Sequence, residues 1–372
     1  MRYFVSTGEA SGELTATLLA AEIRRLDPSA RFEGIGGSRM RDAGFSLWRN
    51  HTGWATLGLF HAIPRIPKML VIGLHTAWHI VRTQPDVVIV VDFGGFHMRL
   101  ARVLRILRYR KPVLDLFPPG AWFDQDKRAR AVARDMTPVT AFTHQRDFYR
   151  SLGLPVHYFG HPLAARYTAR APRTAPSRDG GTIALLPGSR AQELRYHLPA
   201  LCGALLHLRT KRPNIRAVFA AADAAARDAI AKALRDCELE GCSEIADGAL
   251  AALQDADAAW VASGTAVLEA VLCGVPTIGF YIVNPRLARY ARHIYRRKWY
   301  TLPNLVLDRE VVREIMQEAA TPEKLADAMD EMLSDPQPSY MQYAAVREAL
   351  GSPDALAHVA ALAVTLAKEA RS

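Results

Sequence analysis

The sequence is poor in cysteine and has no long apolar run. Its 372 residues include four cysteines, Cys202, Cys237, Cys242 and Cys273, which form no CxxC pair and no zinc-like spacing. We therefore expect buried free thiols in a reducing cytoplasm, without a disulfide framework or a metal site. A run of about eighteen uncharged apolar residues is absent, so no membrane-spanning helix is expected.

The chain also lacks two kinds of recognition signal. Its start, MRYFVSTGEASG, does not have the basic region, apolar stretch and cleavage site of a signal peptide. Neither a zinc-finger spacing nor an RNP-like aromatic motif is present, so we expect no nucleic-acid partner. Positive charge, in contrast, is abundant: 47 Lys and Arg stand against 37 Asp and Glu, a net charge of +10. That balance favours an anionic membrane surface or phosphorylated substrates as partners.

Predicted strands and helices alternate along the chain, and its length indicates two domains. The apolar run PDVVIVVDFGGF (85–96) is typical of a central strand in a parallel sheet. Pro, Gly, Ser and Arg dominate 165–181, which we interpret as a linker. We predict two doubly wound α/β domains, 1–164 and 178–337, with helices at about 338–372 packing back onto the first.

Two strand-turn-helix segments of the second domain predict anion sites. In TIALLPGSRAQELRYHL (182–198), Ser189 fits a helix N-cap and Gln192 completes a capping box. The first amides of such a helix bind anions, and Arg190 adds a cation that can hold two phosphate oxygens. An ordinary turn with a surface arginine stays the alternative. The turn Ser263-Gly264-Thr265 repeats the pattern, and Glu269 can accept hydrogen bonds from a ribose or simply favour the helix dipole.

The first domain carries a glycine turn and a candidate base. GEASGE (8–13) follows a predicted strand, and Ser11 can cap the next helix. Asp92 ends the strand at 85–92, where ligands of open α/β sheets bind, so its carboxylate is a candidate general base. The alternative is a structural Asp that caps the helix from 97 to 108.

Residues 56–83 are apolar, and their only charges are basic. This stretch is either a surface that touches lipid or a helix packed under the sheet. The following helix carries a basic face, which is more often solvated than functional. That face consists of Arg99, Arg102, Arg105, Arg108 and Arg110.

These motifs together resemble the lipid-A-disaccharide synthase family, which are glycosyltransferases of the GT-B fold. The matching stretches, in the family's order, are GEASG (8–12), GGSRM (36–40), PDVVIVVD (85–92), FGHPLA (159–164), LLPGSR (185–190), ASGTAVLE (262–269) and TLPNLV (301–306). The resemblance implies two Rossmann-like domains with a cleft between them. It also implies a cytoplasmic enzyme at the surface of the inner membrane, and leaves a homodimer open.

The family transfers diacylglucosamine from UDP-2,3-diacylglucosamine to 2,3-diacylglucosamine 1-phosphate (lipid X), with inversion and without metal or cofactor. By resemblance, Asp92 is the base, with Glu9 and Ser11 facing the reacting sugars. The residues expected to bind substrate are Gly188, Ser189, Arg190, Glu193, Ser263, Gly264, Thr265, Glu269 and Asn304, with Arg190 at the UDP site and Glu269 and the turn 263–265 at the nucleoside. Those expected to contact the membrane are Leu59, Phe60, Ile63 and Ile66.

The sequence departs from the family in the first, acceptor-binding domain. The family's Asp-Ala-Pro-Asp-Phe-Asn is here Asp-Phe-Gly-Gly-Phe-His (92–97), so the second acid is Gly95 and the asparagine is His97. GEASGD has become GEASGE at Glu13, and the tryptophan loop at 119–124 has lost one tryptophan. Two alternatives therefore stay open: a GT-B transferase with a different acceptor, and a catalytically weak protein that binds a nucleotide sugar or lipid.

Overall fold

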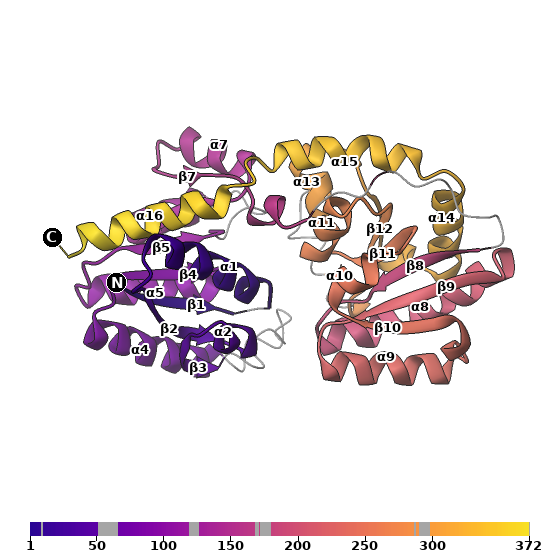
Figure 1. The fold of residues 1–372 in the computed structure, drawn as a ribbon, viewed down its shortest axis with the longest axis horizontal. Helices are drawn as coiled ribbons and strands as arrows, with labels where there is room; N and C mark the ends of the chain where they lie inside the picture. The colour runs from indigo at the N-terminus through magenta and orange to yellow at the C-terminus, as the bar shows by residue number, and fades with distance from the viewer. Residues whose placement is uncertain are drawn as a thin grey trace. The chain divides into compact units, whose positions relative to one another are not determined.

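The computed structural model describes residues 1–8, 10–50, 66–118, 126–167, 171, 180–285, 288–289 and 298–371. Glu9, Leu59, Phe60 and Ile63 lie outside these residues, and of Ile66 only the backbone is described. The chain forms two compact units, 1–166 with 350–372 and 167–349 (Figure 1).

The first unit is built on a parallel sheet of seven strands in the order β3-β2-β1-β4-β5-β6-β7 (Figure 1). The strands are β1 (Arg2–Thr7), β2 (Arg31–Gly36), β3 (Ser46–Asn50), β4 (Val87–Val91), β5 (Val113–Leu116), β6 (Thr137–Thr140) and β7 (His157–Tyr158). Its helices are α1 (Ala10–Leu26), α2 (Ser38–Asp42), α4 (Ile66–Thr83), α5 (Gly94–Ile106), α6 (Asp126–Asp135), α7 (Thr143–Ser151), η2 (Pro162–Ala165) and α16 (Ala355–Glu369).

Alternating apolar residues bury both faces of this sheet. Val87, Ile89 and Val91 of β4 face a core that also holds side chains of α1 and α16. Val88 and Val90 face the opposite core, which side chains of α4, α5, α6 and α7 complete. Because both faces are covered, only the edges formed by the strand ends are available for a polar site.

The second unit repeats the design with six parallel strands in the order β10-β9-β8-β11-β12-β13. The strands are β8 (Gly180–Leu186), β9 (Asn214–Ala221), β10 (Ser243–Asp247), β11 (Ala258–Ala262), β12 (Thr277–Tyr281) and β13 (Arg313–Met316). Its helices are α8 (Ala191–Lys211), α9 (Ala224–Asp236), η3 (Glu240–Cys242), α10 (Gly248–Leu253), α11 (Thr265–Leu272), α13 (Leu302–Leu307), η4 (Gln317–Ala319), α14 (Pro322–Ser334) and α15 (Gln337–Ala349).

The two C-terminal helices, α15 and α16, pack in different units. Helix α16 packs along α1 in the first unit, as we expected for the end of the chain. Helix α15 instead contacts α11 and α13 of the second unit, and its Tyr343 hydroxyl accepts a hydrogen bond from the Thr277 amide at 3.0 Å. The return to the first unit therefore comes after α15, near 350, rather than near 338.

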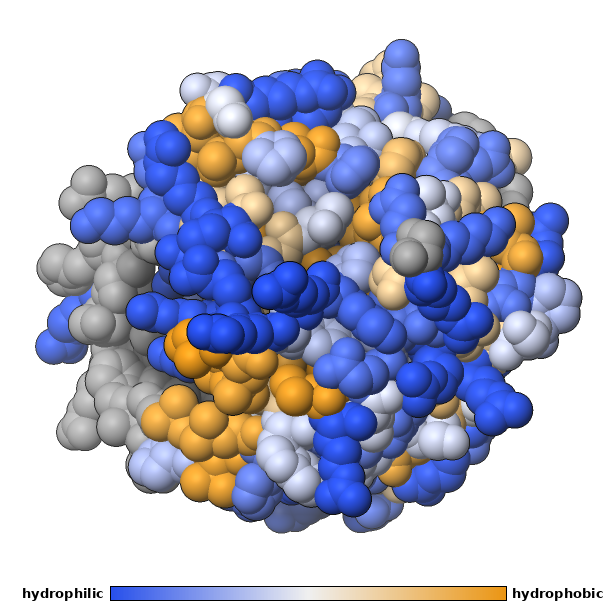
Figure 2. Space-filling view, turned by 90° about the vertical axis from the view of Figure 1, so that its left-hand side faces the viewer, coloured by the Kyte–Doolittle hydropathy of each residue, from blue (hydrophilic) through white to orange (hydrophobic). Residues whose placement is uncertain are grey.

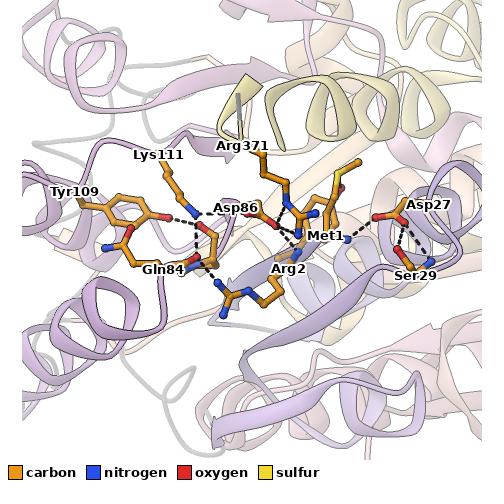
Figure 3. Close-up of polar contacts among 11 residues, drawn as sticks. Met1, Arg2, Asp27, Ser29, Gln84, Asp86, Tyr109, Lys111 and Arg371 are labelled. Atoms are coloured by element: carbon orange, nitrogen blue, oxygen red, sulfur yellow. Dashed lines mark hydrogen bonds and ion pairs between the residues drawn. The ribbon is translucent and has the colours of Figure 1, made fainter. Parts of the chain in front are cut away.

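A polar network closes the amino edge of the first sheet (Figure 3). The buried carboxylate of Asp86 accepts hydrogen bonds from the Arg2 amide at 2.8 Å and from Arg371 at 3.0 Å, and Lys111 lies 3.4 Å away. Burial by itself raises the pKa of Asp86, but the hydrogen bonds from Arg371 and the Arg2 amide lower it below its usual value. The hydrogen bonds and ion pairs of Asp86 occupy the amino edge of the sheet. We therefore expect ligand-binding residues at the carboxyl edge.

None of the helices that the structure describes is long and apolar enough to cross a membrane.

Candidate active site

The carboxylate of Glu193 organises the turn that follows β8. Its Oε2 accepts hydrogen bonds from the amides of Ser189 at 3.0 Å and Arg190 at 3.2 Å. Its Oε1 accepts from the Arg190 guanidinium at 3.1 Å and from the Tyr281 hydroxyl at 2.9 Å. Gly188 has φ +104°, and a Cβ there would lie 2.4 Å from Glu193 Oε2, so only glycine lets the carboxylate approach.

This arrangement corrects the predicted helix cap. The N-cap of α8 is Arg190, not Ser189, and the carboxylate that reaches back is Glu193, not Gln192. The amides of Ser189 and Arg190, which we expected to face an anion, donate to Glu193 in this structure. An anion at this turn would therefore meet the Arg190 guanidinium and the first amides of α8, which lack carbonyl partners within the helix.

Sequence reasoning missed His197, which braces the same turn. Its Nδ1 lies 2.6 Å from the carbonyl oxygen of Pro187, and its Nε2 lies 3.1 Å from both the amide nitrogen and the carbonyl oxygen of Ile282. A neutral ring carries one proton, and the shorter contact assigns it to Nδ1, so that Nε2 accepts from the Ile282 amide. Burial lowers the pKa of His197, which keeps the ring neutral for this pattern. The turn after β8 is thereby tied to the end of β12.

The second predicted turn lies beside the first at the carboxyl edge, because β11 pairs with β8. Ser263 donates its amide to Phe280 O at 2.8 Å and its hydroxyl to Tyr300 O at 3.1 Å. Gly264 is the N-cap of α11, which begins at Thr265. One turn further, Glu269 Oε1 accepts a hydrogen bond from the Tyr167 hydroxyl at 2.7 Å. Glu269 is thus held in place with a second oxygen available to a hydroxyl donor.

Asn304, expected to bind substrate, belongs to the scaffold. Its side chain is fully buried. Nδ2 donates to Val312 O at 2.7 Å and Glu314 Oε1 at 2.9 Å, and Oδ1 accepts from the amides of Val311 and Val312 at 2.8 Å. These contacts use the hydrogen-bonding capacity of the side-chain amide, so a ligand has no side-chain donor or acceptor of Asn304 to bind.

In the first unit, Asp92 follows β4 in a constrained backbone. Asp92 and Phe93 both have left-handed φ, +53° and +52°, which is uncommon for an aromatic residue. Phe93, not Asp92, is the N-cap of α5, so the predicted alternative role of Asp92 as that cap is wrong. Strain of this kind is concentrated at functional sites, where the surrounding packing sustains it.

The glycine turn after β1 lies next to Asp92, because β1 pairs with β4. A Cβ at Gly8 would meet the Phe93 ring at 2.3 Å, so the two turns are in close contact. Helix α1 already begins at Ala10, so Ser11 lies in its first turn and is not the predicted cap. Glu13, a departure from the family, is buried and accepts a hydrogen bond from the Gly37 amide, which caps α2.

His97, another departure from the family, holds the backbone of Asp92. Its Nδ1 lies 2.5 Å from the Asp92 carbonyl oxygen, and its Nε2 lies 2.9 Å from Ser6 Oγ. The carbonyl again requires the proton on Nδ1, so the Ser6 hydroxyl donates to Nε2. Burial lowers the pKa of His97 to about 4, and the ring is neutral at pH 7. His97 therefore positions Asp92 and does not exchange protons itself.

A second carboxyl group, which the sequence reasoning did not single out, lies near enough to Asp92 for the two charges to interact. Asp115 of β5 is buried, and neither of its oxygens has a hydrogen-bond partner among the described residues. Gln145 Oε1 and the Tyr149 hydroxyl, one helical turn apart on α7, are likewise buried and unpartnered there. Burial, and secondarily the charge of Asp92, raise the pKa of Asp115 to about 8.

Helix α4 is the described part of the apolar stretch, and its buried side agrees with the alternative of a helix packed under the sheet. Ile72, Ala77 and Ile80 pack in the core under the sheet. The opposite side of the helix presents a stripe of exposed apolar side chains, with Arg82 over the Trp78 ring at 5.2 Å. We call Leu70, Val71, Leu74 and Trp78, which are 48–59% exposed, the α4 stripe.

Comparison with known proteins decides the family. Residues 3–356 match the family model described as lipid-A-disaccharide synthetase. The chain is 32% identical to the lipid-A-disaccharide synthase of Synechocystis, covering 95% of this chain and 94% of that protein. The corresponding enzyme of Thiobacillus denitrificans is 33% identical, with 86% and 87% covered. This chain belongs to the lipid-A-disaccharide synthase family.

As a member of this family, the protein is a glycosyltransferase of lipid A biosynthesis, as the sequence motifs predicted. Its fold agrees. A UDP-GlcNAc 2-epimerase from Neisseria meningitidis, solved with UDP-GlcNAc, superposes with TM-score 0.66 at 11% identity, covering 98% of this chain and all of that one. A calicheamicin glycosyltransferase gives 0.59 at 14% identity, covering 100% and 99%. The predicted GT-B architecture of two parallel-sheet α/β domains is confirmed.

Proposed function

We propose that this family member transfers diacylglucosamine from UDP-2,3-diacylglucosamine to lipid X. The acceptor's 6-hydroxyl oxygen attacks the anomeric carbon, the bond from that carbon to the diphosphate oxygen breaks, and the hydroxyl proton passes to a base. The products are the β-1,6-linked disaccharide 1-phosphate and UDP. The observation that carries the proposal is the location of the motifs at the two switch points. In each sheet the strand order reverses between the two strands that they follow, β1 and β4 or β8 and β11.

On the donor side, the second unit holds the nucleotide and stabilises the departing diphosphate. Arg190, oriented by Glu193 from one turn further along α8, supplies a fixed cation to the phosphate oxygens. The first amides of α8 add partial positive charge from the helix dipole. Glu269, held by Tyr167, accepts hydrogen bonds from the ribose hydroxyls. Donors positioned for developing negative charge are typically worth about 3 kcal/mol each in the transition state.

On the acceptor side, Asp92 takes the proton of the 6-hydroxyl. The support is its position after the central strand β4, in a left-handed backbone that His97 holds through the Asp92 carbonyl. The glycine turn at 8–12 adjoins Asp92, so Ser11 is available to orient the sugar. Because both substrates carry acyl chains, we further propose that the α4 stripe contacts the membrane surface, with Arg82 and Lys68 facing anionic headgroups.

The first experiment is mass spectrometry of a reaction of the purified protein with UDP-2,3-diacylglucosamine and lipid X. A disaccharide phosphate and UDP are expected. Release of UDP without disaccharide would mean that the protein uses a different acceptor. A donor that stays bound and unreacted would mean that the protein binds the nucleotide sugar without transferring it.

Two variants test the residue roles. Asp92→Asn should lower kcat by about 100-fold or more, as for loss of a general base, with UDP affinity unchanged. Arg190→Ala should weaken UDP binding by about 10- to 100-fold. Arg209→Ala, at the other end of α8, is the matched control and should bind UDP normally. If Asp92→Asn turns over as fast as wild type, Asp92 is not the base. If Arg190→Ala binds UDP as tightly as wild type, Arg190 does not bind the phosphates.

The membrane contact is tested by sedimentation with liposomes. The pair Leu74→Asp and Trp78→Asp removes two exposed side chains of the α4 stripe and should weaken binding by about 1,000-fold, at about 2 kcal/mol for each of the two apolar side chains. Leu250→Asp with Met341→Asp, exposed apolar residues of the second unit, is the control with the same charge change. Equal binding by the stripe pair and wild type would refute the contact.

A further inference from the structure

A groove of about 300 Å³ lies between α5 and α6 on the outside of the first unit. Four arginines line it, Arg99 and Arg102 from α5 and Arg128 and Arg134 from α6, with Asp135 as their single acidic neighbour. All four side chains are exposed, so water and ligands reach them. The sequence alone presented the arginines of α5 as a solvated face; the structure adds a concave surface and the arginines of a second helix.

The charges of the groove are not balanced internally. Arg134 forms two hydrogen bonds with Asp135, at 2.8 and 2.7 Å, and Arg99 donates to the Gly95 carbonyl oxygen at 2.7 Å. Arg102 and Arg128 have no hydrogen bond or ion pair with any residue that the structure describes. Two guanidinium groups therefore remain to form paired hydrogen bonds with the oxygens of one anion, a geometry that suits phosphate.

The end of the groove nearest Asp92 is formed by Gly95, where the family pattern carries an acid. A Cβ at this position would have the Arg99 guanidinium as its nearest neighbour, at 3.8 Å. An aspartate here would place a negative charge against the arginines. Glycine removes that charge, which strengthens the attraction of the groove for an anion.

The surroundings of the groove indicate that the anion is carried by a lipid. Helix α5 packs between α4 and α6 on the same face of the sheet, so the α4 stripe and the groove border one helix from its two sides. Ile106, at the end of α5, adds an exposed apolar side chain. Figure 2, which looks onto the side of the molecule at the left of Figure 1, shows apolar surface in direct contact with strongly hydrophilic surface.

We propose that the α5–α6 groove binds the phosphate group of an acylated lipid at the bilayer surface, through Arg102 and Arg128. The α4 stripe contacts the bilayer that contains such a lipid, and the two arginines bind the phosphate group of the lipid. Two lipids carry this chemistry, a membrane phospholipid and the acylated sugar phosphate of the proposed reaction. The site lies outside the residues assigned to catalysis, and only the second arm of its test rests on the proposed function.

The first arm measures sedimentation with vesicles of phosphatidylglycerol and phosphatidylcholine. Arg102→Gln with Arg128→Gln should bind about 30-fold more weakly than wild type, at about 5-fold per arginine at an anionic surface. Arg31→Gln with Arg41→Gln, exposed arginines of β2 and α2, makes the same charge change away from the groove and should stay within about 3-fold of wild type. Gly95→Asp should weaken binding and Gly95→Asn should not, which tests the groove without removing an arginine.

The second arm measures transfer in neutral detergent micelles, where no phospholipid is present. A higher KM for the acceptor with unchanged kcat in the arginine pair would assign the groove to the acceptor's phosphate. An unchanged KM together with weaker vesicle binding would assign it to membrane phospholipid. Wild-type behaviour in both arms, or equal losses in the control pair, would overturn the proposal. Since the vesicle arm needs no turnover, its failure is distinct from failure of the proposed reaction.

Discussion

Replacing Asp115 by asparagine should stabilise the protein in a way that grows with pH. The buried carboxyl has no partner among the described residues, and burial raises its pKa from 3.8 to about 8. In the folded state it therefore holds a proton at pH 7, whereas in the unfolded chain it is ionised. Asparagine has nearly the same shape and no proton to lose, so the variant removes the cost of keeping the carboxyl neutral.

The magnitude follows from the linkage between protonation and folding. A raised pKa gives a contribution to stability that is complete below the unfolded value near 4 and is lost as pH rises toward 8. At pH 7, about three pH units above the unfolded value, the loss is about 4 kcal/mol. For a unit of about 190 residues, this corresponds to a Tm higher by about 10 °C in the variant.

Thermal unfolding of both proteins, followed by circular dichroism from about pH 3.5 to about pH 8, measures the difference. Asp115→Asn and wild type should converge at the acidic end and separate steadily toward the alkaline end. Asp42→Asn, an exposed acid of α2, is the control and should follow wild type at every pH. A variant less stable than wild type at pH 8, or a difference that does not change with pH, would mean that Asp115 is ionised in the folded protein.

Three further outcomes are expected. Asn304→Ala should lower the free energy of unfolding in urea by about 3 kcal/mol, because buried amides and a carbonyl lose their partners, while UDP affinity stays within about 2-fold of wild type. Asp86→Asn should cost about 2 kcal/mol at pH 7 in the same assay, and the difference should shrink as pH falls below about 4, since the lowered pKa makes this contribution vanish when the carboxylate protonates. Gly8→Ala should cost about 1–3 kcal/mol through its clash with Phe93, whereas Gly241→Ala, with open space around it, should be neutral.

The features that local chemistry determines were predictable. The apolar run of β4 and the glycine turns after β1 and β8 fix where strands end, and the alternation of strands with helices fixes a parallel sheet. The position of Asp92 at a carboxyl edge followed from these elements alone. The cap of α8 did not, because Gln192 and Glu193 are adjacent and both have a side chain able to reach back. A shift of one residue in the start of the helix decides between them.

The features that depend on distant contacts were not predictable. Asn304 lies in a loop-like sequence, TLPNLV, and its scaffold role depends on residues at 311–314 that fold back over it. In the sequence, His197 does not differ from the other residues of a predicted helix. Its role depends on Ile282, which follows β12 and lies beside it only in the folded chain. Asp115 offered one local signal, a lone acid within the apolar run VLDL, but its unpartnered state depends on α7 covering it.

The departures from the family at positions 95 and 97 have different consequences. Asparagine and neutral histidine both present an N–H donor, so His97 preserves the kind of hydrogen bond that an amide at this position would give to the Asp92 carbonyl. Burial keeps the ring neutral, and the exchange therefore adds no charge beside the candidate base. Gly95, in contrast, removes an acid from the end of a groove lined by arginines. A change in what the first unit binds should consequently follow from position 95 and the α5–α6 groove, and not from His97.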